Sequence, residues 1–208
     1  MTDNIHEDEQ LLTSGVALEE AEKVAILLHG RGATAHGILQ LENQLKVEDT
    51  AFFAPQAKNR TWYPHSFMKP QDQNQPHLAS ALNTIDKLIE DIEKEIDVEK
   101  IVLIGFSQGA CLATEYAASN PRKFGGVIGF SGGLIGDELP EYTGDIQNSS
   151  VFLGCAENDP HIPLERVEAT EKVFHELGGN VEKYIFEGSH HGIVDYELER
   201  ARKIVEEL

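Results

Sequence analysis

Ser107 is the residue of this sequence whose setting points most directly to chemistry. It occupies the middle of Gly105-Phe106-Ser107-Gln108-Gly109, between an apolar run and an apolar helical pattern. A Gly-x-Ser-x-Gly sequence between a buried strand and a helix forms a sharp turn that presents the serine hydroxyl. A side chain at either glycine would collide with neighbouring backbone, and the helix N-terminus favours developing negative charge. The pattern predicts a nucleophilic serine; the alternative is a serine that only caps the helix.

A serine nucleophile needs a base, and the base needs a carboxylate that orients it. In proteins with this turn, the acid and then a histidine follow the serine along the chain. Asp159 lies in a loop after the apolar run 151–154 and just before a helical pattern, so it is the predicted acid. Glu157, two residues nearer the strand, is the second candidate. Asp159 could instead cap the helix, and Glu157 could be an exposed loop carboxylate.

The loop after the next predicted strand carries two adjacent histidines, His190 and His191. A histidine in this loop can reach across to Ser107, and spacing alone does not distinguish the two. The other histidine would then be a surface or supporting residue. Adjacent loop side chains rarely converge on one ion, and no His, Asp or Glu set has ligand spacing, so no metal site is predicted.

A His-Gly-x-Gly turn, residues 29–32, follows the first long apolar run. Acyl transfer builds negative charge on the carbonyl oxygen, and preorganised N–H groups stabilise that charge. The amide of Arg31 in this turn and the amide of Gln108 after the serine are the predicted donors. The alternative for these glycines is an ordinary tight turn.

Trp62 and Tyr63 lie in the segment 59–64, which follows the apolar run 51–54. Aromatic residues at this edge of a sheet are expected to line a substrate pocket. The alternative is that they cover the core. Four other histidines are expected to be surface or structural residues: His36, His65, His77 and His161.

Short apolar runs predict six strands, and continuous runs of this length indicate strands buried on both faces of a parallel sheet. The runs are 24–29, 51–54, 101–104, 126–130, 151–153 and the more alternating 181–186. Helical patterns cover 78–96, 107–118, 164–177 and 195–208. Their alternation predicts an α/β fold with a mostly parallel central sheet and helices on both faces, in which chemistry gathers at the carboxyl ends of the strands. We expect a single domain over 1–208, with a flexible acidic N-terminus over 1–10.

The charge balance limits the partners of the protein. Its 208 residues include 36 acidic and 17 basic residues, a formal net charge of −19. Nucleic acids and anionic membranes bind basic surfaces, so neither partner is expected. No apolar run reaches the ~18 residues of a membrane span, and the N-terminus lacks the features of a secretory signal, so we expect a cytoplasmic protein. Cys111 and Cys155 lack zinc-site spacing and are expected to be buried.

Taken together, the motifs resemble the phospholipase/carboxylesterase family, which includes small bacterial esterases and acyl-protein thioesterases. The resemblance rests on 27–32, on 105–110, on Asp159 followed by the Ile-Pro of 162–163, and on a final Gly-x-x-His. It covers nearly the whole chain from about Val24. It implies an α/β-hydrolase fold without a large lid, activity on carboxylic esters and no cofactor.

The resemblance also bears on individual residues. In the family, a β-branched or small apolar residue usually stands two positions after the histidine. His191, which Ile193 follows at that distance, is therefore the predicted base. Arg31 departs from the apolar residue of the thioesterase branch and is more similar to a bacterial branch of predicted esterases. The family also suggests a homodimer.

The predicted function is a serine carboxylesterase that hydrolyses small to medium carboxylic esters through Ser107, His191, Asp159 and an acyl-enzyme. An acyl thioesterase or lysophospholipase with the same triad is the first alternative. A binding protein for small molecules on the same fold is the second, and the complete set of motifs argues against it. A dienelactone-type hydrolase is less expected, because such enzymes use cysteine at this position. The expected partner is a small ester substrate.

Overall fold

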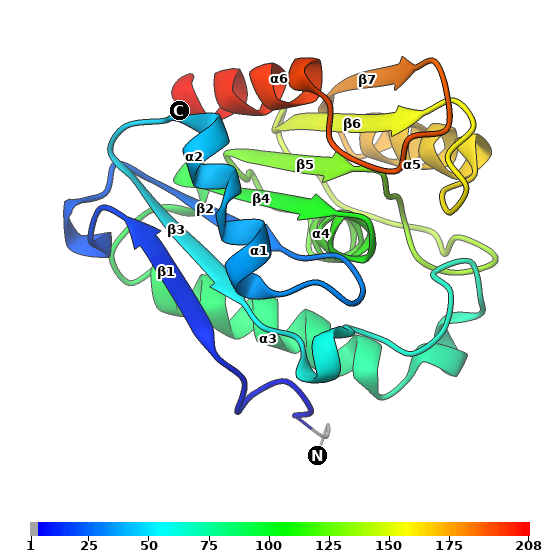
Figure 1. Ribbon diagram of the computed structural model, residues 1–208, viewed down its shortest axis with the longest axis horizontal. Coiled ribbons are helices and arrows are strands. Elements are labelled where there is room, and N and C mark those ends of the chain that lie inside the picture. Colours follow the sequence, from blue (N-terminus) through cyan, green and yellow to red (C-terminus); the bar gives the residue numbers. More distant parts are fainter. Residues whose placement is uncertain (1–3) are drawn as a thin grey trace.

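Seven strands form one sheet in the computed structural model, which describes residues 4–208 (Figure 1). The order across the sheet is β1-β3-β2-β4-β5-β6-β7. Every neighbouring pair is parallel except β1 and β3, so β1 is an antiparallel edge strand. The strands are β1 Leu11–Gly15, β2 Lys23–Leu28, β3 Thr50–Pro55, β4 Ile101–Phe106, β5 Gly126–Phe130, β6 Ser150–Ala156 and β7 Asn180–Phe186.

Helices cover both faces of the sheet (Figure 1). Helices α3, α4 and α5 pack against one face, and α1, α2 and α6 pack against the other. Alternate strand residues point to the two faces, so Ile26 of β2 joins the first apolar cluster and Leu27 joins the second. The helices are α1 Ala35–Leu39, α2 Leu41–Leu45, α3 His77–Ile92, α4 Gln108–Ser119, α5 Leu164–Glu176 and α6 Asp195–Glu206. Short 3₁₀ turns are η1 Leu18–Glu20, η2 Lys58–Arg60, η3 Gln71–Asn74 and η4 Val98–Lys100.

The parallel register brings several strand ends to one edge of the sheet. Leu28 at the end of β2 pairs with Gly105 in β4. Ala156 at the end of β6 pairs with Phe186 at the end of β7. The loops that follow β2, β4, β6 and β7 therefore open at the same edge, which is where ligands bind in sheets of this kind.

The predicted α/β sheet is confirmed, and each predicted strand and helix is present. Within the described residues, one strand and two α-helices were not predicted: β1, α1 and α2. Strand β1 contains no buried residue, and α1 and α2 have five residues each, which is too short for a helical period to appear. The predicted helix over 78–96 ends at Ile92, but the turn after it still packs Ile96 against the core.

The N-terminal segment is anchored at His6, contrary to the expected flexible terminus; residues 1–3 of that prediction lie outside the described residues. The His6 side chain is buried. The Lys58 amide donates to its Nδ1 (3.0 Å), and its Nε2 donates to the Trp62 carbonyl (3.0 Å). Burial lowers the pKa of His6, although the bond to the carbonyl raises it. A neutral ring therefore joins the N-terminal segment to the loop after β3.

None of the helices within residues 4–208 is long and apolar enough to cross a membrane. Helix α3 has 16 residues, and its outer side carries the exposed side chains of Lys87, Glu90 and Asp91. It is an amphipathic helix of the protein surface.

Helix α6 brings a buried carboxylate against the sheet. The Val194 amide donates to Oε2 of Glu197 (2.7 Å), while Oε1 has no partner among the described residues. A Cβ at Gly154 of β6 would lie 2.0 Å from Oε1, so only glycine leaves room for this side chain. Burial raises the pKa of Glu197 to about 7, although the bond from Val194 lowers it.

The raised pKa makes stability depend on pH. Because Glu197 binds its proton more tightly in the folded state, its contribution is complete below about pH 4.5 and is lost as the pH rises through about 7. A shift of this size corresponds to roughly 3 kcal/mol. We expect Glu197→Gln to flatten the fall in the free energy of unfolding between about pH 5 and about pH 8, measured by urea unfolding. Glu199→Gln, exposed on the same helix, should leave the slope unchanged. An unaltered slope in Glu197→Gln would contradict the assignment.

Candidate active site

Ser107 occupies the sharp turn between β4 and α4. Its φ of 54° and ψ of −117° lie in a region that residues with a side chain rarely adopt. The Ser107 amide donates to the Phe130 carbonyl at the end of β5 (2.9 Å), and the Ser107 carbonyl accepts from the Cys111 amide (3.0 Å). Both main-chain groups of the serine are thereby fixed, and the strained conformation is held by the sheet on one side and the helix on the other.

The two glycines of the turn are required by close backbone contacts. A Cβ at Gly105 would lie 2.2 Å from the carbonyl oxygen of Gly109. A Cβ at Gly109 would lie 2.0 Å from the carbonyl oxygen of Leu28 in β2. Both distances are far below van der Waals contact, so the sequence expectation of collisions at these positions is confirmed.

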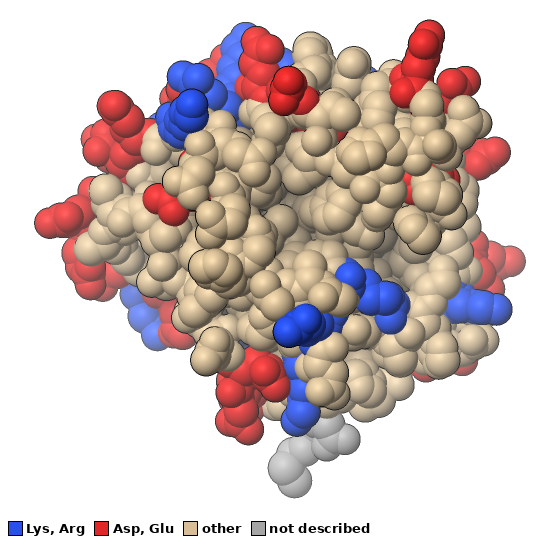
Figure 2. All heavy atoms as spheres, viewed as in Figure 1, with Lys and Arg blue, Asp and Glu red and all other residues tan. Residues whose placement is uncertain are grey.

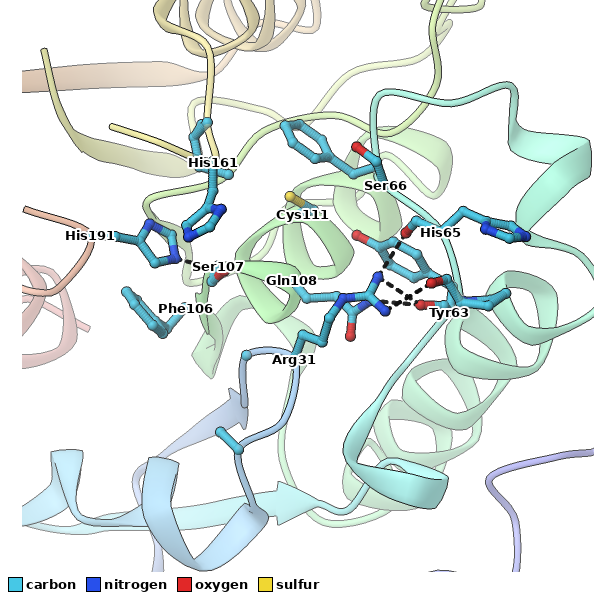
Figure 3. Close-up of a pocket in the computed structure, with 15 residues that line it drawn as sticks. Arg31, Tyr63, His65, Ser66, Phe106, Ser107, Gln108, Cys111, His161 and His191 are labelled. Carbon is cyan, nitrogen blue, oxygen red and sulfur yellow. Dashed lines mark hydrogen bonds between the residues drawn. The ribbon is translucent and has the colours of Figure 1, made fainter. Parts of the chain in front are cut away.

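The structure brings together three residues that come from separate loops (Figure 3 shows the contact between two of them). His191 Nε2 lies 2.9 Å from Ser107 Oγ, and His191 Nδ1 lies 2.7 Å from Asp159 Oδ2. Ser107 follows β4, Asp159 follows β6 and His191 follows β7. The hydrogen-bonded order is that of a serine nucleophile, its base and the acid that orients the base.

Asp159 is held as a buried anion. Its side chain has 0% exposure, and its Oδ1 accepts hydrogen bonds from the amides of His161 (2.8 Å) and Ile162 (3.0 Å). Burial by itself raises the pKa of Asp159, but the bond from His191 and those two amides together hold it below its ordinary value. The carboxylate therefore stays charged and keeps the Nδ1 proton of His191 in place.

The two alternative residues lie outside this chain of contacts. Glu157 and His190 are both exposed, and neither reaches Ser107 or the base. The His190 ring folds over Gly192, where a Cβ would lie 2.3 Å from its Nε2. The geometry thus agrees with the predicted acid, Asp159, and selects His191 from the two histidines that the residue pattern left open.

The amides of Arg31 and Gln108 are available to a ligand. Among residues 4–208, no group accepts a hydrogen bond from either amide. By contrast, the next two amides of the same turn are used: Gly32 donates to Arg60 (2.7 Å) and Ala33 donates to Gly30 (3.1 Å). Both Arg31 and Gln108 line the cavity beside Ser107, as an oxyanion-binding pair requires.

The side chains of the same two residues fix the loop that follows β3, a role that the sequence analysis missed. The Gln108 amide group accepts from the Trp62 amide and donates to the Tyr63 carbonyl, both at 2.9 Å. The Arg31 guanidinium donates at 2.7–2.9 Å to three successive carbonyls, those of Tyr63, Pro64 and His65. Contacts across 30 or more residues leave no local signal in the sequence.

His29 supports the turn at residues 29–32, which carries the Arg31 amide and is called the oxyanion turn below. The Ala57 amide donates to its Nε2 (3.1 Å), so Nδ1 carries the proton and donates to the Gly30 carbonyl (2.8 Å). Burial lowers the pKa of His29, although the bond to Gly30 raises it, and the ring stays neutral. The Trp62 indole donates to the His29 carbonyl (2.9 Å). The turn after β2 is thereby tied to the loop that follows β3.

A cavity of about 550 Å³ opens above Ser107 (Figure 3). Phe106 and His161 flank the base, with ring centroids 5.0 and 4.8 Å from that of His191. Tyr63 lines this cavity, as expected. Trp62 does not: its side chain is fully buried beneath the turn, so its assignment to the substrate pocket is corrected to the core.

Cys111 and Cys155 are buried free thiols, and neither belongs to a metal-binding cluster among residues 4–208. Within residues 4–208, no group of three or more His, Cys, Asp or Glu side chains is placed to hold a metal ion. Cys111 and Cys155 are buried, as expected, and burial raises the pKa of each thiol to about 12. Neither thiol is a nucleophile at neutral pH.

The close contact at Gly109 gives a stability prediction. Gly109→Ala should lower the free energy of unfolding by about 2 kcal/mol or more, because α4 must move away from β2. Gly37→Ala is the matched control: its Cβ would meet only Thr34 Oγ1, at 3.4 Å, and should be tolerated. Urea unfolding measures both variants. Equal stability of the two would show that the turn has room for a side chain.

The chain is similar to known proteins over almost its full length. A family model described as Phospholipase/Carboxylesterase matches residues 16–208. Acyl-protein thioesterase 1 of Saccharomyces cerevisiae is 28% identical over 211 residues, which cover 88% of this chain and 91% of the relative. The corresponding protein of Kluyveromyces lactis is 28% identical over 177 residues, covering 75% and 78%.

Solved structures agree with the family match. The crystal structure of a phospholipase/carboxylesterase from Dyadobacter fermentans is 42% identical with a TM-score of 0.92, covering 95% of this chain and 96% of that one. The Bacillus cereus carboxylesterase is 16% identical with a TM-score of 0.79 and covers 99% of both chains, which shows a shared fold. The chain therefore belongs to the phospholipase/carboxylesterase family and is a serine hydrolase of the α/β-hydrolase fold that acts on ester bonds.

Proposed function

We propose that this enzyme is a carboxylesterase that hydrolyses small to medium carboxylic esters through an acyl-enzyme on Ser107. The observation that carries the proposal is the unbroken hydrogen-bonded chain from Ser107 Oγ through His191 to the buried Asp159 carboxylate. Ser107 and His191 line a cavity, and beside them lie two backbone amides that have no acceptor among the described residues.

The first half-reaction transfers the acyl group to the enzyme. The Ser107 oxygen attacks the ester carbonyl carbon while its proton passes to Nε2 of His191. Asp159 stabilises the resulting imidazolium through Nδ1–H. The carbonyl oxygen becomes an anion that accepts hydrogen bonds from the amides of Arg31 and Gln108. The ester C–O bond then breaks, and the proton on His191 goes to the departing alcohol.

The second half-reaction returns the free enzyme. Water gives a proton to His191 and attacks the acyl carbon, and the oxyanion forms again between the same two amides. When the bond to Ser107 breaks, the serine oxygen recovers the proton from His191 and the carboxylic acid leaves.

The cavity supports substrates of small to medium size. Its volume of about 550 Å³ falls within the range of small-molecule sites. Phe67, Phe106 and Ile162 line it and offer apolar contact to an acyl or alcohol group.

Acyl thioesters are the second candidate class, because the curated relatives described above are named acyl-protein thioesterases. Lysophospholipids are a further class that the same triad admits. Relative kcat/KM values for a butyryl oxyester, a butyryl thioester and a lysophospholipid, with octanoyl analogues of the first two, separate these classes. A preference for the thioester or for the longer chain would favour the alternative.

Removal of the nucleophile or the base should abolish turnover. With p-nitrophenyl acetate, butyrate and octanoate, we expect Ser107→Ala and His191→Gln each to lower kcat by about 10⁴-fold or more. His190→Gln is the matched histidine control and should retain wild-type kcat, because His190 lies outside the chain of contacts. Ser107 should also react with a fluorophosphonate probe. Wild-type turnover by Ser107→Ala would exclude the mechanism.

Asp159 is expected to contribute by orienting His191 and by stabilising its charged form. Asp159→Asn removes the anion that stabilises the imidazolium and allows the wrong tautomer, so we expect kcat to fall by about 10³–10⁴-fold with little change in KM. Glu157→Gln, which removes an exposed carboxylate two residues away, is the control and should have no effect. Steady-state kinetics at neutral pH measures both, and equal losses in the two variants would be inconsistent with the assignment.

A further inference from the structure

The cavity differs sharply in charge from the rest of the molecule. The chain carries a formal net charge of −19, yet no Asp or Glu is among the described residues that line the cavity. Its basic side chains are Arg31, His65, His161 and the base His191. The nearest carboxylate in the mechanism, Asp159, has no exposed side-chain surface and is covered by His191. A ligand in the cavity therefore meets a cation and several N–H donors but no anion.

The charge of Arg31 is held in place without being neutralised. Its guanidinium donates to three main-chain carbonyls, which carry no net charge. No carboxylate within residues 4–208 forms an ion pair with it. Arg166 of α5 is also held by three main-chain carbonyls, but it does not line the cavity. Arg122, Arg200 and Arg202 are each paired with a glutamate.

The position of this cation fits recognition of a substrate. Figure 3 shows the Arg31 guanidinium and the His191 ring on opposite sides of Ser107. A guanidinium has five N–H groups in a planar fork, so three bonds to carbonyls leave donors for a further oxygen. An ester with its carbonyl at Ser107 would extend one end toward Arg31.

Charged side chains are also distributed unevenly on the outer surface around the cavity. On the face shown in Figure 2, the region over the carboxyl ends of β4 and β5 is largely uncharged, with Lys and Arg side chains along its lower side and most Asp and Glu toward the margin. An anion that approaches this face therefore meets less negative charge over the cavity than at the margin.

We propose that the enzyme selects esters that carry a second, anionic group, a carboxylate or a phosphate, which binds against Arg31. This inference rests on the proposed esterase function and names its substrate class. A neutral ester gains at most a weaker hydrogen bond from the unpaired guanidinium. An anionic ester forms a charge-assisted hydrogen bond with it.

A purely structural role of Arg31 predicts a different result. If the side chain only braces the loop at residues 63–65, its loss slows every ester alike. If it also binds the substrate anion, its loss changes the ratio of kcat/KM between a charged ester and its neutral analogue. The ratio therefore separates the two roles, whatever happens to the absolute rates.

The test compares two pairs of substrates, and hydrolysis of each is measured by the release of protons. Monomethyl glutarate and methyl pentanoate differ by a carboxylate, and butyrylglycerol phosphate and butyrylglycerol differ by a phosphate. We expect wild type to favour the charged member of at least one pair by about tenfold, the size of one charge-assisted hydrogen bond. The pair that shows the preference identifies the anion. Added salt should reduce the ratio.

Three variants assign the preference to this side chain. Arg31→Gln should bring the ratio close to one, and Arg31→Lys, which keeps the charge, should retain most of it. Arg60→Gln is the matched control, because Arg60 is exposed and lies outside the cavity lining, so the ratio should stay as in wild type. The proposal is overturned if wild type favours both neutral esters, or if Arg31→Gln slows both members of a pair equally.

Calorimetry measures anion binding directly and so tests the anion site independently of ester hydrolysis. If wild type hydrolyses none of the esters, the proposed function fails, and binding of glutarate and glycerol phosphate to Ser107→Ala still tests the anion site. Binding that is lost when Arg31→Gln is added supports the site. Absence of binding by both anions overturns it.

Discussion

Helix α4 begins so close to β2 and β4 that no side-chain carbon fits at Gly105 or Gly109. The chain has to turn from strand to helix within this space, and it does so by placing Ser107 at a positive φ. Such a conformation costs of order 1–3 kcal/mol and persists only where the surroundings determine it. The sheet and the helix hold the serine in this conformation. The serine hydroxyl and the free amide of Gln108 both take their positions from this one turn.

A network of hydrogen bonds preserves that geometry around the turn. His29 ties the oxyanion turn to the strand end of β3, and the side chains of Gln108 and Arg31 tie the following loop to both. Trp62 is buried between these connections. Buried polar groups that are fully hydrogen-bonded make a region rigid, and rigid N–H donors stabilise a developing anion without reorganising during the reaction.

The charged side chains of the site differ in how deeply they are buried. Asp159 is the deepest, and it is compensated by His191 and by two backbone amides rather than by a cation. The base covers it, so its negative charge does not face the cavity. Arg31 stands on the other side of the nucleophile, where its charge is unpaired among the described residues. The site can thus contain an essential anion and still present a positive surface to a substrate.

The sequence by itself determined the parallel sheet, the turn at Ser107 and the order of acid and base along the chain. These features depend on local sterics and on the period of apolar residues, which a single sequence records. The residue pattern predicted Asp159 over Glu157 but did not choose between His190 and His191, and the family resemblance favoured His191. In the folded loops, Asp159 and His191 are the pair in contact.

Only the tertiary structure placed Trp62 in the core and Tyr63 at the cavity. It also revealed the anchoring of His6, the support from His29 and the unpaired charge of Arg31. Strand β1 escaped prediction because an edge strand with no buried residue lacks an apolar signal. The other features depend on contacts between residues that lie 28 to 56 positions apart in the chain. The physical reason is common to all of them: a side chain's partners across the fold are set by packing, which local residue types do not encode.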